Sequence, residues 1–111
     1  QRDFVYMDDV VEAFALAATK PLAPGSVFHI GSGVGTPVRE VVELILKLMV
    51  SSVKPLLGVL PTRPDEIVEM SANVSAARDQ LGWHPRTSLE QGLARTIDWV
   101  REHREMVLKL P

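Results

Sequence analysis

Apolar residues recur along this chain with two spacings, and the alternation between the two predicts its secondary structure. Short apolar runs rich in β-branched and aromatic residues are typical of strands. Three such runs lie at residues 4–7, 27–30 and 67–70. Longer segments repeat apolar residues three and four positions apart, as on one face of a helix. Four such segments begin near residues 8, 37, 73 and 89. Strands that alternate with helices predict an α/β fold.

The first two predicted helices have recognisable starts. Asp8 or Asp9 suits the N-cap of the first, because a carboxylate accepts from the free amides of a first turn. Thr36 and Pro37 open the second, since threonine is a good N-cap and proline is favoured at the first helical position. The apolar stripes expected to face a core are Val11, Phe14, Ala15 and Ala18, and then Val38, Val41, Val42, Ile45, Leu48 and Met49.

The last two predicted helices carry capping signals at their ends. Asn73 is expected to cap a short helix through residue 81, and Gly82 to end it in the left-handed conformation. Ser88 followed three residues later by Gln91 is a capping box. It predicts a helix that continues to residue 107.

Composition limits what the chain can be. At 111 residues it is one domain or part of one, and with 46% hydrophobic residues it has enough apolar side chains for a core. No apolar run approaches the ~18 residues that span a membrane. The formal charge of −2 gives no electrostatic footprint for nucleic acid. The absence of cysteine suits a reducing compartment, and we expect a cytoplasmic protein. Because the chain starts at Gln1 directly before a strand-like run, we expect it to be part of a longer protein.

Three patterns of catalytic or cofactor-binding proteins are incomplete. The glycine-rich segment 31–35 lies between a predicted strand and a predicted helix, but Thr36 stands where the dinucleotide motif G-x-G-x-x-G requires glycine. A tight turn is the favoured interpretation. The only tyrosine, Tyr6, is followed four residues later by Val10 and not by lysine. The three histidines have no metal-ligand spacing. No catalytic, cofactor-binding or metal-binding residue is therefore predicted.

The loop at residues 60–66 is the main candidate for ligand binding. Prolines on both sides of Arg63 predict a stiff, extended segment that holds its side chain in place. A guanidinium matches the geometry of a phosphate group. The alternative is a surface charge paired with Asp65 or Glu66. Trp83 and Trp99 are expected to be packing residues and not stacking platforms for a ligand.

Four motifs in one order resemble the extended short-chain dehydrogenases/reductases that act on nucleotide sugars. They are residues 2–10 (RDFVYMDDV), residues 27–33 (VFHIGSG), residues 63–66 (RPDE) and residues 81–93, which contain LGWHP and SLEQGL. His29, Asn73 and Ala76 stand where this family usually has asparagine, aspartate and lysine.

The resemblance implies a fold, a cofactor and site residues. Members of this family, which includes NAD-dependent epimerases and dehydratases, have an N-terminal Rossmann domain for NAD and a C-terminal portion for the nucleotide sugar. Residues 1–111 correspond to part of one domain, the C-terminal portion, with short strands alternating with amphipathic helices and without the NAD domain. The residues matching Arg2 and Arg63 commonly bind the diphosphate, and the residue matching Glu66 commonly meets the ribose. Because residues 1–111 do not include the NAD domain, the chain alone is expected to be inactive.

An alternative from another class is a stand-alone, non-catalytic α/β module for interaction or assembly. The apolar helix stripes normally pack on a Rossmann sheet, and residues 1–111 do not contain that sheet. An isolated chain covers such stripes by self-association or exposes them to a partner. We expect a homodimer through these faces, which sedimentation distinguishes from a monomer.

Overall fold

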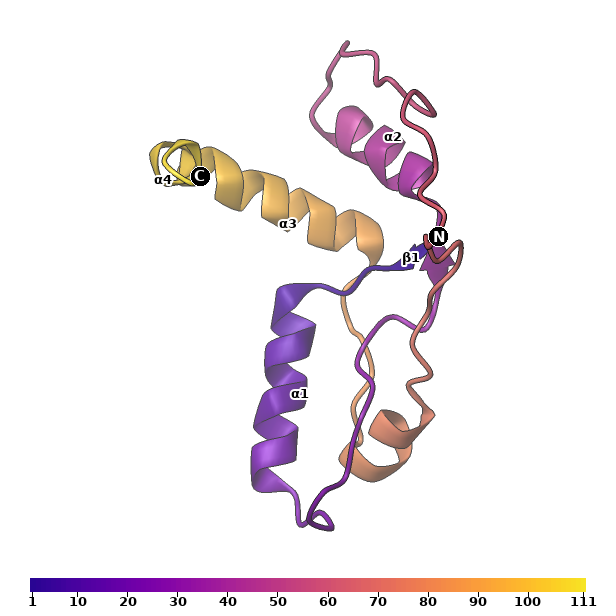
Figure 1. Cartoon of the computed structure of the whole chain (residues 1–111). Coiled ribbons are helices and arrows are strands. Elements are labelled where there is room, and N and C mark those ends of the chain that lie inside the picture. Colours follow the sequence, from indigo (N-terminus) through magenta and orange to yellow (C-terminus); the bar gives the residue numbers. More distant parts are fainter.

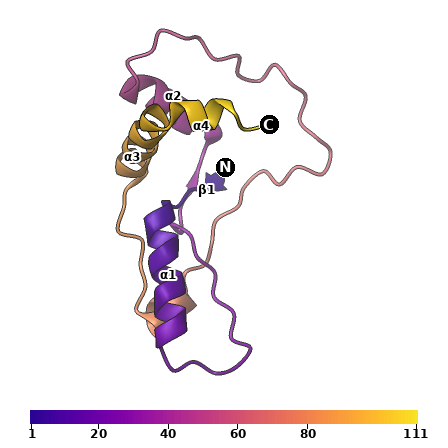
Figure 2. The same ribbon diagram turned by 90° about the vertical axis from the view of Figure 1, so that its left-hand side faces the viewer.

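The computed structural model describes residues 1–111, and most of its regular structure is helical (Figure 1). Its dimensions of 49 × 38 × 27 Å make it elongated. In order, its elements are β1 (Arg2–Asp3), α1 (Met7–Thr19), β2 (Gly35–Thr36), α2 (Val38–Leu48), the π-helix η1 (Ala77–Leu81), α3 (Leu89–Glu102) and α4 (Arg104–Leu108). Helix α1 and η1 lie at one end, and α2, α3 and α4 lie at the other (Figures 1 and 2). No helix is long and apolar enough to cross a bilayer.

The capping signals of the C-terminal half are confirmed. The Ser88 hydroxyl accepts from the Gln91 amide, and the Gln91 side chain accepts from the Ser88 amide, both at 3.2 Å. Gly82 follows η1 with a φ of 66°, the left-handed conformation predicted for it. The prediction of one helix to residue 107 is wrong, because the backbone leaves helical geometry at His103 and separates α3 from α4.

The predicted N-caps of α1 and α2 are wrong by a few residues. The N-cap of α1 is Tyr6, which makes no side-chain cap, and Asp8 and Asp9 lie in the first turn. The N-cap of α2 is Pro37, since Thr36 belongs to β2. The prediction for Asn73 is confirmed, because its Oδ1 accepts from the Ser75 amide at 3.1 Å, at the start of the helical turn that runs into η1.

The predicted four-residue strands are not formed. The only ladder is antiparallel and short, with Arg2 opposite Thr36 and Asp3 opposite Gly35. A strand needs a partner for its backbone groups, and no segment of this chain pairs with residues 4–7 or 27–30. The run at 67–70 comes nearer to a strand. Gln1 donates from its amino group to the Val68 carbonyl and accepts from the Met70 amide, which is the pattern of a parallel pair.

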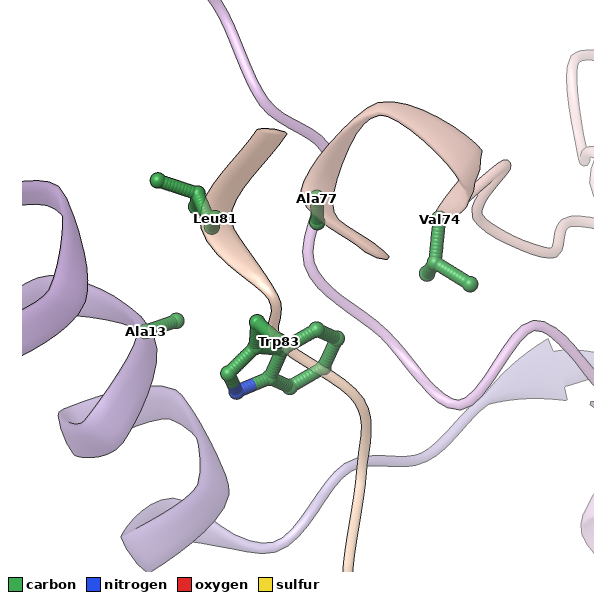
Figure 3. Close-up of a cluster of buried hydrophobic side chains, with 5 residues drawn as sticks. All are labelled: Ala13, Val74, Ala77, Leu81 and Trp83. Carbon is green, nitrogen blue, oxygen red and sulfur yellow. The ribbon is translucent and has the colours of Figure 1, made fainter. Parts of the chain in front are cut away.

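The core lies between α1 and η1. It consists of five buried residues, Ala13, Val74, Ala77, Leu81 and Trp83. Figure 3 shows the indole of Trp83 in the middle of this cluster, between Ala13 and Val74. The Trp83 Nε1 donates to the Asp9 carbonyl at 2.8 Å, so its one polar atom is satisfied. The prediction that Trp83 is a packing residue is confirmed.

The apolar stripe predicted for α1 is not buried in this structure. Val11 is 56% exposed and Phe14 is 73% exposed, while Asp9 and Ala13 are the buried residues of α1. Next to this stripe is a hollow of about 240 Å³ with an entirely apolar lining, made by Val10, Ala13, Phe14, Ala17, Phe28, Ile30 and Leu81. The stripe of α2 is better covered, because α2 packs against α3 and buries Val41. The expectation of an unpartnered helix face therefore holds for α1.

Candidate functional site

The carboxylate of Asp3 joins three segments that are far apart in the sequence. Its Oδ1 accepts from the Ser32 amide at 2.7 Å and from the Ser32 hydroxyl at 2.6 Å. Its Oδ2 accepts from the Gly33 amide at 3.0 Å and from the Ala72 amide at 2.9 Å. One side chain thus ties β1 to the glycine-rich turn and to the end of the long loop that follows α2. We call this arrangement the Asp3 knot.

The Asp3 knot favours the ionised carboxylate. Burial alone would raise the pKa of Asp3, but the hydrogen bonds from the Ser32 hydroxyl and from the amides of Ala72, Ser32 and Gly33 outweigh it. The pKa of Asp3 is therefore lowered below its ordinary value of 3.8. All four donors point their hydrogens at negative charge, and a neutral carboxyl group would accept from fewer of them.

The lowered pKa predicts a loss of stability in acid. A group whose pKa is lower in the folded state stabilises the fold above its unfolded pKa, and this contribution disappears as the pH falls through the folded pKa. We expect the free energy of unfolding to decrease more between about pH 5 and pH 3 for the wild type than for Asp3→Asn. Urea unfolding at both pH values measures this. Asp98→Asn, an exposed change on α3, should keep the wild-type pH dependence. An equal pH dependence for wild type and Asp3→Asn would contradict the prediction.

The Arg63 loop is a turn, which corrects the prediction of an extended segment. The Glu66 amide donates to the Arg63 carbonyl at 3.1 Å, so residues 63–66 form a β-turn with Pro64 at its second position. Proline favours that position because its φ is already set for it. The turn brings Arg63 and Glu66 to the same corner, and both residues are exposed.

Arg2 and Glu66 lie together, and Arg63 makes no ion pair. The Arg2 Nη2 is 3.9 Å from the Glu66 Oε1, and each side chain is a little over one-third exposed. The Arg2 Nη1 also donates to the Ile67 carbonyl at 2.6 Å. The one other ion pair joins Arg86 to Glu12. The pairing of Arg63 with Asp65 or Glu66, considered as an alternative, is therefore not present.

The glycine-rich turn at 31–35 does not fit a dinucleotide phosphate. The amides of Ser32 and Gly33, which would have to face a phosphate, already donate to the Asp3 carboxylate. The negative charge of that carboxylate would also repel a phosphate placed beside it. The predicted strand-to-helix turn is replaced by bends at Gly31 and Gly33 that lead into β2, and we assign no part of a cofactor site to these residues.

The aromatic residues Tyr6 and Trp99 have structural partners. The ring of Tyr6 lies under the guanidinium of Arg95, 5.6 Å from its centroid, in a cation–π arrangement. Trp99 stacks on His103 with ring centroids 4.2 Å apart, yet it remains 48% exposed. Trp99 is thus a surface packing residue on α3. No group of three or more metal-ligating side chains is placed to hold an ion.

Sequence patterns did not reveal two acidic residues that organise this region. The sequence predicts no role for Asp3, although this residue lies within the motif at 2–10, because its hydrogen-bond donors are 29 to 69 residues away. Asp9 was expected to cap a helix, and instead it is buried and accepts from the Thr87 amide at 3.0 Å. A carboxylate in a short motif can make such a contact, but neither its burial nor its partner can be read from spacing alone.

Known proteins match most of this chain. A family model described as GDP-mannose 4,6 dehydratase matches residues 1–96. The chain is 34% identical over 100 residues to the UDP-glucose 4-epimerase of Mycolicibacterium smegmatis, a match that covers 90% of this chain and 31% of that protein. The chain spans about one-third of the length of the relatives it matches. This coverage agrees with the C-terminal portion predicted from the order of the motifs.

Solved structures of full enzymes share this fold. The UDP-glucose 4-epimerase of Thermotoga maritima, solved with UDP-glucose, is 35% identical, with a TM-score of 0.83 over 93% of this chain and 32% of that one. The enzyme WbmF of Bordetella bronchiseptica, solved with NAD+ and UDP, is 28% identical, with a TM-score of 0.80 over 97% of this chain and 32% of that one. The α/β fold class is thereby confirmed. Because the family model covers residues 1–96, the chain belongs to the GDP-mannose 4,6 dehydratase family, within the NAD-dependent nucleotide-sugar epimerases and dehydratases whose motifs it carries.

Proposed function

We propose that residues 1–111 form the substrate-side part of an NAD-dependent nucleotide-sugar epimerase or dehydratase and anchor the nucleoside diphosphate of its substrate. The observation that carries this proposal is the exposed corner formed by Arg63 and Glu66, with Arg2 beside it. The relatives solved with UDP-glucose and with UDP support a nucleotide ligand.

The three side chains have distinct roles in the proposed site. Arg63 has no ion-pair partner, so its guanidinium can offer two parallel N–H groups to phosphate oxygens. Arg2 already donates through Nη1 to the backbone carbonyls of Gln1 and Ile67, which leaves the other N–H groups of its five for the diphosphate. The Glu66 carboxylate accepts hydrogen bonds only, which suits the vicinal hydroxyls of a ribose.

NAD and the acid/base pair belong, in this proposal, to a part of the enzyme outside residues 1–111. When bound there, NAD would itself accept a hydride from the sugar. Within this chain the glycine-rich turn is occupied by Asp3, and Tyr6 faces Arg95 with no lysine four residues later. We therefore propose that the isolated chain is inactive and that the chemistry requires the longer, cytoplasmic enzyme.

The binding role of Arg63 is tested by its removal. Arg63→Ala in the full-length enzyme should weaken the binding of a free nucleoside diphosphate by about 1.5–3 kcal/mol, the scale of hydrogen bonds to a charged group. Calorimetric titration with UDP and GDP measures this change. Arg39→Ala, which removes an exposed arginine from the first turn of α2, is the matched control and should leave the affinity unchanged. An unchanged affinity and KM in Arg63→Ala would remove Arg63 from the site.

A second candidate function is a stand-alone interaction or assembly module. The observation that favours it is the exposed apolar face of α1 with the hollow beside it. For the isolated chain we propose a homodimer through this face, which would sediment at twice the mass of one chain. In the longer enzyme the same face would instead lie against the rest of the protein.

A further inference from the structure

The loop that carries Arg63 is held at its C-terminal end by the first three residues of the chain. Residues 52–71 are all exposed, so no core packing fixes the loop. It sweeps away from the body of the molecule in Figure 2. The hydrogen bonds and the ion pair that reach its C-terminal end from elsewhere come from Gln1, Arg2 and Asp3.

These three contacts follow one another along the loop. Gln1 pairs through its backbone with residues 68 and 70. The Arg2 guanidinium reaches the Ile67 carbonyl and the Glu66 carboxylate. The Asp3 carboxylate accepts a hydrogen bond from the Ala72 amide. Arg2 and Asp3 also pair through their backbone with Thr36 and Gly35. Of the three side chains, only that of Asp3 hydrogen-bonds to this third segment, through the amides of Ser32 and Gly33.

The two oxygens of the Asp3 carboxylate accept from different segments. Oδ1 accepts only from Ser32, from its amide and its hydroxyl. Oδ2 bridges Gly33 and Ala72, and so it is the atom that ties the loop to the glycine-rich turn. The geometry next to Oδ2 has no spare room, since a Cβ on Gly31 would lie 2.6 Å from it.

We propose that Asp3 is a positioning residue for the nucleoside-diphosphate site. Its carboxylate fixes the loop at Ala72, and the adjacent Arg2 then holds Glu66 and Ile67 in register with Arg63. This proposal rests on the proposed function, because it assigns to Asp3 the placement of side chains that contact the nucleotide. Asp3 itself contacts no ligand, since its lone pairs are taken by four donors.

The test compares Asp3→Asn with Ser32→Ala in the full-length enzyme. An amide has one oxygen in place of two, so Asp3→Asn cannot accept from both sides of the knot. Its Kd for UDP or GDP should rise about five- to tenfold. Ser32→Ala removes one hydrogen bond from the same carboxylate but leaves the bond to Ala72, and its Kd should stay within about twofold of wild type.

A double-mutant cycle separates positioning from general destabilisation. If Asp3 acts through the loop, Arg63→Ala should weaken binding less in the Asp3→Asn background than in the wild type. Additive effects would overturn the positioning role. An unchanged Kd in Asp3→Asn, with a weakened Kd in Arg63→Ala, would overturn the role of Asp3 alone. An unchanged Kd in Arg63→Ala would overturn the proposed function and this inference with it.

Amide hydrogen exchange on the wild-type enzyme tests the positioning role of Asp3 even if Asp3→Asn fails to fold. Coupling is reciprocal, so nucleotide binding should stabilise the Asp3 knot as much as the knot favours binding. Saturating UDP or GDP should therefore slow amide hydrogen exchange at Ala72 and Gly33. Unchanged exchange at these two amides, with slowed exchange at Glu66, would show that the loop binds nucleotide without Asp3 and would overturn the inference.

Discussion

Replacing Trp83 with alanine is expected to lower the free energy of unfolding by about 3–5 kcal/mol, the range for removing a large aromatic residue from a core. Trp83 is 1% exposed and lies in the middle of the five-residue core. Its indole touches both α1 and the η1 region, so alanine would leave a cavity between the two elements that hold each other in place. The Asp9 carbonyl would also lose its indole donor.

Trp99→Ala is the matched control for this change. Trp99 is the only other tryptophan, is 48% exposed, and stacks on His103 at the surface of α3. Its loss should cost about 1 kcal/mol or less. Urea unfolding followed by circular dichroism measures both variants. A loss from Trp83→Ala no larger than that from Trp99→Ala would mean that the core does not depend on the indole.

Local signals in the sequence predicted the elements whose cause is local. Ser88 and Gln91 are three residues apart and satisfy each other, so the start of α3 follows from four residues of sequence. Gly82 ends η1 for a similar reason, because only its own backbone has to enter the left-handed region.

The strands could not be predicted from local sequence, because a strand depends on its partner. The run at 27–30 has the composition of a strand but no ladder within these residues. By contrast, Arg2 and Asp3 are polar and yet form β1, because Gly35 and Thr36 lie opposite them. Backbone pairing between segments therefore determines which residues form strands, even against the strand preference of the residues themselves.

In the candidate site, too, contacts between neighbouring residues could be predicted from the sequence and contacts between distant residues could not. The motif at 63–66 predicted both Arg63 and Glu66 as site residues, and the turn places them at one corner. The position of Arg2 beside Glu66 joins residues 64 positions apart, and only the resemblance to a family suggested it. The Asp3 knot was not predicted at all, because backbone amides donate three of its four hydrogen bonds and any residue type supplies these.

Gly31→Ala is expected to lower the free energy of unfolding by about 2.5–6 kcal/mol, because the new methyl group has no room. Its Cβ would lie 2.6 Å from the Asp3 Oδ2 and 2.7 Å from the Ala72 Cβ. Overpacking costs about 1–3 kcal/mol. Displacing Asp3 from its amide donors adds about 1.5–3 kcal/mol for a hydrogen bond to a charged group.

Gly58→Ala distinguishes crowding from backbone strain. Gly58 has a φ of 70°, but no atom lies within 4 Å of the place that a methyl group would take, so alanine there should cost only about 1–2 kcal/mol of left-handed strain. Gly31, in contrast, is not in the left-handed region, and its cost arises from Asp3 and Ala72. In an Asp3→Ala background, Gly31→Ala should therefore cost less than in the wild type. Equal costs of Gly31→Ala in the two backgrounds would mean that this glycine is required for a reason other than the Asp3 knot.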